Sequence, residues 1–457
     1  MTNNYILNIF NNQKNFFESN ATLNIKNRKL ILKQLKIALK KNYKEITAAL
    51  KKDLNKSEQE VFITEYVIVM NEIKYMIKKL SSFSHKKKVS KSMTTMFSKS
   101  YTIAKPKGVC LISVPWNYPF QLALVPLIDA IASGNTAIVF LPHQTQFINK
   151  TITNILGSVF KDEHVICINK DLVPYENLFD VKYDFVFFTG SYNVGKIIAQ
   201  QCANTLTPYT LELGGKNPTI ITKDANLNLA AKRIARAKWF NAGQTCVAPD
   251  FVVIESSVYE QFIGLMKIYI DKFYAKLLGS DKYPKIISEE HFNRISGYFD
   301  DKNIIYGGKI DRNTLTIAPT MISAEFNSSC MKEEIFGPIL PIIQIEDLVT
   351  LKDSLKPFNE SLALYIFCKS KEHIANITNN FSSGAVCIND ALMHISNHHL
   401  PFGGVGKSGI GSYHGKTGFN TFSNTVSYLK TSTTFDSCLF YPPWSKIKTA
   451  IIKMFTK

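Results

Sequence analysis

Residues 185–195 read Phe-Val-Phe-Phe-Thr-Gly-Ser-Tyr-Asn-Val-Gly, and this segment decides how the rest of the chain is interpreted. An apolar run, a glycine and then a helical stretch are typical of a buried strand that turns directly into a helix. The backbone N–H groups at such a turn, together with the helix dipole, suit the pyrophosphate of a dinucleotide. Gly190 and Gly195 do not form a GxGxxG pattern, so the segment alone is a weak dinucleotide signal.

Short β-rich runs and helical stretches alternate on both sides of this segment. The expected strands are 109–114, 137–141, 164–169, 184–190, 218–222, 251–255, 339–345, 363–368 and 384–389, and the expected helices are 122–133, 146–160, 194–203, 227–241 and 258–276. This alternation indicates parallel sheets covered by helices, and two α/β domains in tandem explain it better than one. Upstream, the spacing predicts helices 27–54 and 57–83, followed by a Ser/Thr/Lys-rich excursion or arm.

The composition is that of an ordinary globular protein, with 45% hydrophobic and 20% charged residues. A net charge of +18 can attract polyanions, but the sequence contains no recognised nucleic-acid module, so we expect no nucleic-acid partner. Eight scattered cysteines without a CxxC pair predict no metal site, no disulfide framework and a cytoplasmic location. The N-terminus lacks the pattern of an export signal. The uncharged segment 108–128 has the length of a membrane span, but its three prolines argue against one.

Two segments surround a chemically useful side chain with small or apolar neighbours. Asn-Ala-Gly-Gln-Thr-Cys-Val-Ala-Pro at 241–249 holds Cys246, a thiol that can attack a carbonyl if it is accessible and deprotonated. Thr-Leu-Glu-Leu-Gly-Gly-Lys-Asn-Pro at 210–218 holds Glu212 in an apolar strand, where burial would raise its pKa toward that of a general base. The structural alternatives are an inert core cysteine and a salt-bridged or strand-edge glutamate.

Three loops complete the set of motifs. Pro-Trp-Asn-Tyr-Pro at 115–119 follows a predicted strand, and the Asn117 amide either donates to a developing oxyanion or only forms a turn. Glu-Glu-Ile-Phe-Gly-Pro at 333–338 and Leu-Pro-Phe-Gly-Gly-Val-Gly-Lys-Ser-Gly at 400–409 are loops without obvious chemistry of their own. In their order and spacing, the six motifs resemble the aldehyde dehydrogenase superfamily over residues 60–430. NAGQTCVAPD, the run at 411–424 and a late Tyr-Pro-Pro are similar to its class 3 branch, which takes apolar aliphatic or aromatic aldehydes.

The resemblance implies NAD(P)-dependent oxidation of an apolar aliphatic, terpenoid or aromatic aldehyde to a carboxylic acid. Cys246 would form a thioester, Glu212 would activate the water that hydrolyses it, and Asn117 with the Cys246 backbone N–H would bind the oxyanion. Gly190 and Gly195 would border the pyrophosphate, and Glu334 and Phe336 would contact the nicotinamide ribose and ring. The full implied set of cofactor residues is Trp116, Gly190, Ser191, Gly195, Glu334 and Phe336, and no metal is implied.

The implied fold combines a Rossmann-like cofactor domain, an α/β catalytic domain and a small β oligomerisation arm. The expected bounds are 1–84 with 105–211 for the cofactor domain, 212–411 for the catalytic domain, 85–104 with 412–436 for the arm, and 437–457 for a basic C-terminal tail. The arm implies a homodimer. Lys446, Lys448, Lys453 and Lys457 give the tail a basic amphipathic pattern, which predicts either weak peripheral contact with an anionic membrane or a solvated helical end.

One segment departs from the family pattern Gly-Asn-apolar-Lys-Pro-Ser-Glu. At 134–143 the chain reads Gly-Asn-Thr-Ala-Ile-Val-Phe-Leu-Pro-His, so Phe140 replaces the lysine that reaches the adenosine ribose, and His143 replaces the glutamate that helps choose between NAD and NADP. If no other group replaces the lysine, the loss of its charge-assisted hydrogen bond would weaken cofactor binding by about 1.5–3 kcal/mol. Loss of the acidic group would remove the repulsion of a 2′-phosphate, so the choice between NAD and NADP stays open.

Three functions therefore stay open at this stage. A hydrolytic dehydrogenase is favoured because Glu212 is present. The alternatives are a CoA-acylating aldehyde dehydrogenase and a weakly active or inactive family member that acts as a binding protein.

Overall fold

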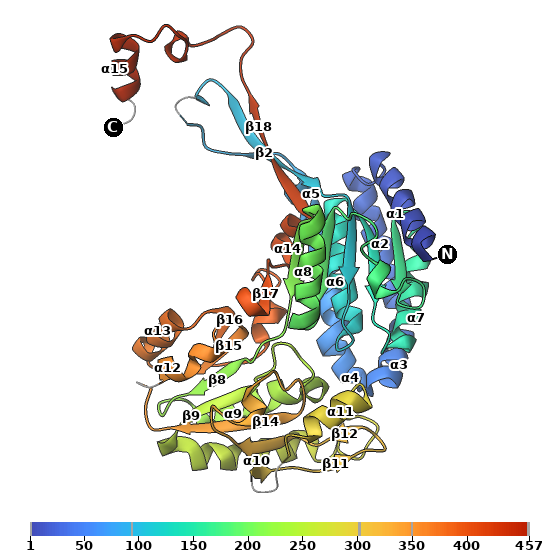
Figure 1. Cartoon of the computed structure of the whole chain (residues 1–457), viewed down its shortest axis with the longest axis vertical. Coiled ribbons are helices and arrows are strands. Elements are labelled where there is room, and N and C mark those ends of the chain that lie inside the picture. The colour runs from blue at the N-terminus through green and yellow to red at the C-terminus, as the bar shows by residue number, and fades with distance from the viewer. Residues whose placement is uncertain (1, 93–94, 300–302, 349–350, 455–457) are drawn as a thin grey trace.

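The structure, a computed structural model, describes residues 2–92, 95–299, 303–348 and 351–454, which form two large sheets, their covering helices and a projecting arm (Figure 1). The first sheet has the strand order β17-β7-β6-β3-β4-β5. Its five parallel strands are β3 (Val109–Ser113), β4 (Thr136–Leu141), β5 (Val165–Asn169), β6 (Phe185–Thr189) and β7 (Tyr209–Glu212), and β17 (Gly409–Ile410) joins β7 antiparallel. The carboxyl ends of the parallel strands therefore share one edge.

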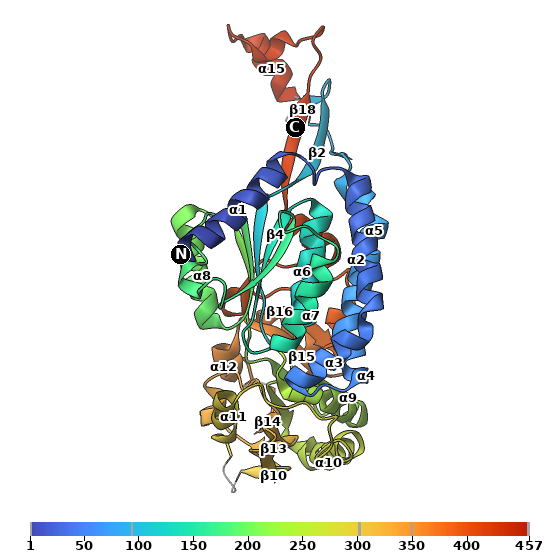
Figure 2. The same ribbon diagram turned by 90° about the vertical axis from the view of Figure 1, so that its right-hand side faces the viewer.

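Helices cover both faces of this sheet, as Figure 2 shows. On one face Val109, Leu111 and Ile138 pack with α1 (Thr2–Glu18) and α8 (Tyr192–Thr205). The alternate residues Cys110 and Val139 face the larger core, which includes α5 (Val67–Ser84), α6 (Pro119–Ser133) and α7 (Gln146–Gly157). Burial on both faces explains why these strands are continuous apolar runs.

The second sheet has seven strands in the order β10-β13-β14-β9-β8-β15-β16, and all its neighbouring pairs are parallel except β10 with β13. Its strands are β8 (Pro218–Ile221), β9 (Phe251–Glu255), β10 (Ile304–Tyr306), β13 (Thr320–Ser323), β14 (Ile339–Ile345), β15 (Ser361–Phe367) and β16 (Ser383–Ile388). The accompanying helices are α9 (Leu227–Trp239), α10 (Tyr259–Tyr274), α11 (Glu289–Ser296), α12 (Leu351–Leu355) and α13 (Lys371–Asn380), and β11 (Ile310–Asp311) pairs with β12 (Thr316–Ile317). The predicted α/β fold with two parallel sheets is confirmed.

The arm is a third sheet, β1-β2-β18, formed by β1 (Lys87–Lys88), β2 (Lys99–Pro106) and β18 (Ser423–Lys430). It projects from the body, and the chain continues beyond it to α15 (Lys446–Met454) (Figure 1). Lys457, the last lysine of the predicted basic stretch, lies outside the described residues. Within the described ranges, no helix has the length and apolar character needed to cross a membrane. Segment 108–128 is instead a strand, a loop and the start of α6, as expected.

The expected strands are present within about two residues at each end, but the N-terminal helices differ from the prediction. The predicted helix 27–54 is two helices, α2 (Ile25–Lys41) and α3 (Tyr43–Leu54), because Asn42 lies between them and its Nδ2 donates to the carbonyl of Ala38. The predicted helix 57–83 is α4 (Glu58–Val61), a π turn (Phe62–Tyr66) and α5. The domain bounds stay a prediction; β17, within the expected range 212–411, pairs with the first sheet.

The π turn directs Glu65 into the interior, where it forms a fully buried ion pair with Lys56 at 2.6 Å. The second carboxylate oxygen of Glu65 accepts the N–H groups of Phe120 and Gln121 at the start of α6. Lys56 Nζ also donates to the carbonyl oxygen of Asn117 at 2.8 Å. This pair therefore fixes the loop between β3 and α6.

We predict that Lys56→Met lowers the free energy of unfolding by about 3–5 kcal/mol, because it leaves the Glu65 carboxylate buried without its cation. Urea unfolding measures the change. The matched control is Lys51→Met, whose ion pair with Asp281 is exposed to solvent, and which should change the free energy by less than about 1 kcal/mol. Equal effects of the two substitutions would contradict the assigned role of Lys56.

Candidate active site

Two cavities meet at the carboxyl edge of the first sheet and share Glu212 and Cys246 in their walls. One, the apolar pocket, has a volume of about 360 Å³ and lies between the π turn, α5, α6 and residues 392–398. The other, the long cleft, has a volume of about 770 Å³ and follows the ends of β3, β4 and β6. A group bound in the pocket and a group bound in the cleft would meet at Cys246.

The loop that carries Cys246 has a strained backbone, and hydrogen bonds to other segments hold it in place. Asn241 and Ala242 adopt consecutive left-handed conformations, with φ of 50° and 52°. Such residues persist only where the surroundings fix them, at roughly 1–3 kcal/mol each. Here the Asn241 amide donates to the Asn117 carbonyl at 2.9 Å, and the Asn217 amide donates to the Cys246 carbonyl at 2.8 Å. Long-range hydrogen bonds therefore hold the cysteine in one position.

The electrostatic surroundings keep the Cys246 thiol protonated. Burial, followed by the charges of Glu334 and Glu212, raises the pKa of the thiol to about 12, and nearby backbone N–H groups oppose this only in part. The thiolate is therefore a minor form at neutral pH, and it is strongly basic once formed.

Glu212 is the last residue of β7 and its carboxyl group is isolated. Its side chain is 2% exposed, and neither carboxyl oxygen has a hydrogen-bond partner within the described part of the chain. Burial raises the pKa of this carboxyl well above its usual range. A buried carboxyl with a raised pKa is a stronger base when ionised, which suits activation of a water molecule.

Asn117 reaches the same place from the loop after β3. It is 3% exposed, and its Nδ2 donates to the carbonyl oxygen of Gln244 at 3.2 Å. A side-chain amide carries two N–H donors, so the second can serve an oxyanion formed at Cys246. The neighbouring Tyr118 hydroxyl bonds Thr245 Oγ1 at 2.6 Å, which adds a second tie between this loop and the cysteine loop.

The predicted cofactor residues occupy the long cleft, with one exception. Trp116, Gly190, Ser191, Glu334 and Phe336 line it, and the rings of Trp116 and Phe336 meet edge to face at 5.4 Å. Gly195 is instead buried one turn into α8, where a Cβ atom would come within 2.6 Å of Leu213 Cδ2. Because Gly195 has no side chain, α8 packs closely on the segment after β7.

These residues fit a dinucleotide. A Cβ atom at Gly190 would lie 2.4 Å from the Phe188 ring, so a larger residue at this turn into α8 would force that ring to move. Ser191 caps α8, and the N–H groups and dipole at that helix start attract a pyrophosphate. Burial and the charge of Asp250 raise the pKa of Glu334 to about 8, which makes it a neutral or anionic hydrogen-bonding partner at one end of the cleft.

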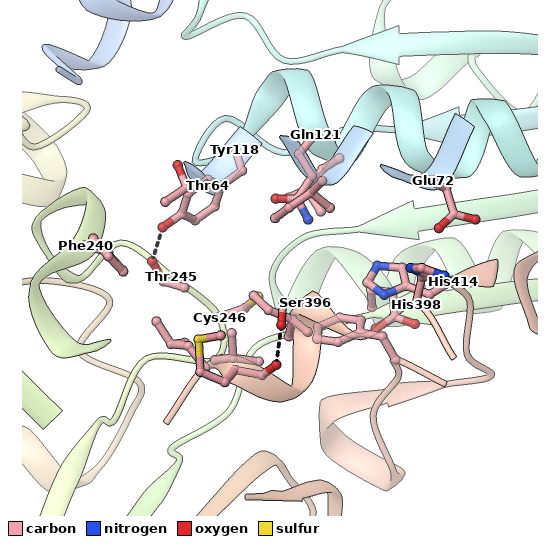
Figure 3. A pocket seen from close by; sticks show the side chains of 18 of the residues that line it. Thr64, Glu72, Tyr118, Gln121, Phe240, Thr245, Cys246, Ser396, His398 and His414 are labelled. Carbon is pink, nitrogen blue, oxygen red and sulfur yellow. Dashed lines mark hydrogen bonds between the residues drawn. The ribbon is translucent and has the colours of Figure 1, made fainter. Parts of the chain in front are cut away.

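Several residues of the site were missed by the sequence analysis. Lys238 is fully buried beside Glu334, its Nζ has no partner among the described residues, and burial lowers its pKa to about 8. Figure 3 shows Glu72, His398 and His414 at the end of the apolar pocket away from Phe240 and Thr245. Lys238 is one of four basic residues in α9 and Glu72 lies in an amphipathic helix, so neither stands out in the sequence.

Two parallel sheets, a dinucleotide-sized cleft and a thiol beside a carboxyl group define the class: an α/β oxidoreductase with a cysteine at the junction of its two binding spaces. The chain belongs to the aldehyde dehydrogenase family, whose sequence model matches residues 2–428. The predicted membership is thereby confirmed, and the protein is an aldehyde dehydrogenase.

Relatives place the chain in the class 3 branch, as expected. It is 38% identical over 452 residues to the 4,4'-diaponeurosporen-aldehyde dehydrogenase of Staphylococcus aureus, covering 98% of each chain. It is 36% identical to the mouse (Mus musculus) aldehyde dehydrogenase family 3 member A2, covering 96% of this chain and 92% of the relative. The solved substrate-bound structure of Staphylococcus aureus AldH superposes with a TM-score of 0.96 at 38% identity over 99% of both chains.

We predict that iodoacetamide modifies Cys246 about tenfold faster for each pH unit between pH 7 and pH 9, because the thiolate fraction rises in that proportion below a pKa of about 12. Glu334→Gln removes the carboxylate whose charge raises this pKa most and should increase the rate at pH 8 by lowering that pKa. Peptide mass spectrometry follows the reaction, with the exposed Cys438 as internal reference. If the rate of Cys246 modification stopped rising below pH 8, the thiol would already be ionised there, and a stabilised thiolate would contradict the raised pKa.

Proposed function

We propose that this enzyme oxidises an apolar aldehyde to a carboxylic acid through a thioester on Cys246, with NAD or NADP as the hydride acceptor. The observation that carries the proposal is the shared wall: Cys246 and Glu212 border both the apolar pocket and the long cleft. An aldehyde in the pocket would lie against the thiol and face whatever occupies the cleft.

The first half-reaction forms the covalent intermediate. The Cys246 thiol gives its proton to solvent water, its sulfur attacks the aldehyde carbon, a C–S bond forms and the carbonyl oxygen becomes an oxyanion. The Asn117 amide and the Cys246 backbone N–H donate to this oxyanion. Its collapse restores the C=O bond, expels a hydride and leaves a thioester. When bound, the nicotinamide supplies the acceptor for that hydride, which no side chain can do.

The second half-reaction releases the acid. Glu212 takes a proton from a water molecule, the resulting hydroxide attacks the thioester carbon, and the C–S bond breaks to return the Cys246 thiolate. Trp116, Gly190, Ser191, Glu334 and Phe336 would hold the dinucleotide in the cleft, while Gly195 supports the helix start behind it. The isolated carboxyl of Glu212 favours hydrolysis over transfer of the acyl group to CoA.

The apolar pocket supports an aliphatic, terpenoid or aromatic substrate. Ile63, Val67, Ile68 and Leu122 contribute to its walls. Each methylene that a substrate buries there would add about 0.8 kcal/mol to binding. The pocket narrows the substrate to this class without selecting one aldehyde within it.

The oligomeric state and surroundings form part of the proposal. β18 is an edge strand of the arm, which supports a homodimer, and the dog (Canis lupus familiaris) relative at 38% identity is described as dimeric and NADP-preferring. α15 exposes Ile447 and Met454 among its lysines, which supports weak peripheral contact with an anionic membrane. We infer a cytoplasmic location from the scattered free cysteines.

We predict a rise in absorbance at 340 nm when the purified enzyme is mixed with a medium-chain aldehyde and NAD or NADP, with the free acid as product. Cys246→Ala should abolish the rise, because it removes the sulfur that forms the thioester. Cys438→Ala, at an exposed cysteine, is the matched control and should retain it. Turnover only in the presence of CoA would establish an acylating enzyme, and no turnover by folded protein would establish a binding role.

A further inference from the structure

The apolar pocket changes in character along its length. At one end Phe240 and Thr245 contribute to the wall next to Cys246. The other end, which we call the polar end, is formed by Glu72, His398 and His414 (Figure 3). A substrate held at Cys246 would therefore extend from the reacting end toward polar side chains.

Between the two ends, Gln121 brings an unused amide group to the pocket. The residue lies in the first turn of α6, and its backbone N–H donates to Glu65 Oε2 at 3.2 Å. Its side chain lines the pocket and is only 8% exposed, yet within the described ranges no hydrogen bond reaches its amide. Neither amide atom is fully enclosed, and Figure 3 shows the amide directed from α6 into the pocket.

The amide of Gln121 needs a partner that the protein does not supply. A buried polar group that loses its hydrogen bonds costs about 1–3 kcal/mol. In the resting enzyme, water can supply these bonds from the pocket. A substrate that displaces this water must either replace the hydrogen bonds or lose that free energy, so Gln121 discriminates between substrates.

The imidazoles of the polar end are neutral at pH 7. Burial lowers the pKa of His414 to about 3, and burial followed by a neighbouring imidazole lowers the pKa of His398. Glu72 accepts the N–H of Gly415 at 2.9 Å, and burial raises the pKa of its carboxyl to about 7. The polar end therefore presents hydrogen-bonding groups without a cation.

Arg236 also lines the pocket, but its guanidinium group is engaged. Its Nη2 donates to Asp390 Oδ1 at 2.7 Å and to the carbonyl oxygen of Ala391 at 3.0 Å. It lies one helical turn before Phe240, at the end away from Glu72. Among the described residues that line the pocket there is thus no unpaired cation, and a carboxylate on the substrate chain would lose its hydration without compensation.

We propose that Gln121 selects aldehydes that carry a hydroxyl group on the apolar chain, away from the aldehyde carbon. The inference rests on the proposed function and narrows its substrate class. A hydroxyl group can donate to the amide oxygen of Gln121 or accept from its nitrogen, which an unsubstituted chain cannot do. The polar end continues this surface, so the hydroxylated part of the chain is not pressed against apolar side chains alone.

Steady-state kinetics with paired aldehydes tests the proposal. Terminally hydroxylated straight-chain aldehydes, longer than those that close to cyclic hemiacetals, are each compared with the unsubstituted aldehyde of equal non-hydrogen atom count. At the length whose hydroxyl reaches Gln121, kcat/KM should exceed that of the unsubstituted aldehyde by at least about tenfold, mainly through a lower KM. Equal or lower kcat/KM for the hydroxylated member at every length would overturn the proposal and leave the dehydrogenase intact. Turnover of no aldehyde by folded protein would overturn the proposed function itself.

Variants of Gln121 separate a hydrogen bond from a matter of shape. Gln121→Met keeps the side-chain length and removes the amide, so it should reduce the preference to within about twofold, raising KM for the hydroxylated aldehyde and lowering it for the unsubstituted one. Gln121→Glu keeps a hydrogen-bonding group and should retain most of the preference. Gln34→Met, at an exposed position of α2, is the matched control and should change neither KM. A full preference in Gln121→Met, or its equal loss in Gln121→Met and Gln121→Glu, would contradict the role of the amide.

Discussion

The carboxyl group of Glu212 is buried without a hydrogen-bond partner among the described residues, and the rest of the site depends on this isolation. A solvated or ion-paired carboxylate would be a weak base, whereas desolvation makes it strong. The sequence keeps it isolated by ending β7 at this residue, between Thr189 of β6 and Gly409 of β17. The side chain thereby enters the wall shared by the two cavities. An unpaired buried acid is destabilising, and departures of this kind from good packing are expected at functional sites.

The cysteine loop shows how the two sheets cooperate. The left-handed Asn241 is held by the Asn117 carbonyl from the loop after β3, and the Cys246 carbonyl is held by the Asn217 amide just before β8. Neither sheet alone would therefore fix Cys246. Lys56 and Glu65 in turn fix the Asn117 loop from the helical N-terminal region. The active site is therefore a junction of segments that lie far apart in the sequence. This explains why the chemistry-bearing motifs are spread over almost the whole chain.

The sequence predicted the parts of the protein that local patterns determine. Apolar runs located the strands because these are buried on both faces, and the motifs at 115–119, 210–218 and 241–249 pointed to Asn117, Glu212 and Cys246, which line one cleft. It did not predict α1, whose many Asn residues hide its apolar face, or the π turn, which inserts one residue without a sequence signal. Lys238 was missed because its burial depends on neighbours from other segments. From the sequence, Phe140 indicates only the loss of the lysine that reaches the adenosine ribose. The structure adds that the Phe140 ring packs against Tyr175.

The central claim is that Cys246 carries the acyl group and that Glu212 removes it. The most direct measurement is mass spectrometry of Glu212→Gln enzyme, mixed with aldehyde and cofactor and quenched with acid before digestion. The account predicts that the peptide containing Cys246 gains the mass of the acyl group, because attack and hydride loss proceed while hydrolysis lacks its base. Cofactor reduction without an acyl group on Cys246, or an acyl group on another residue, would contradict it.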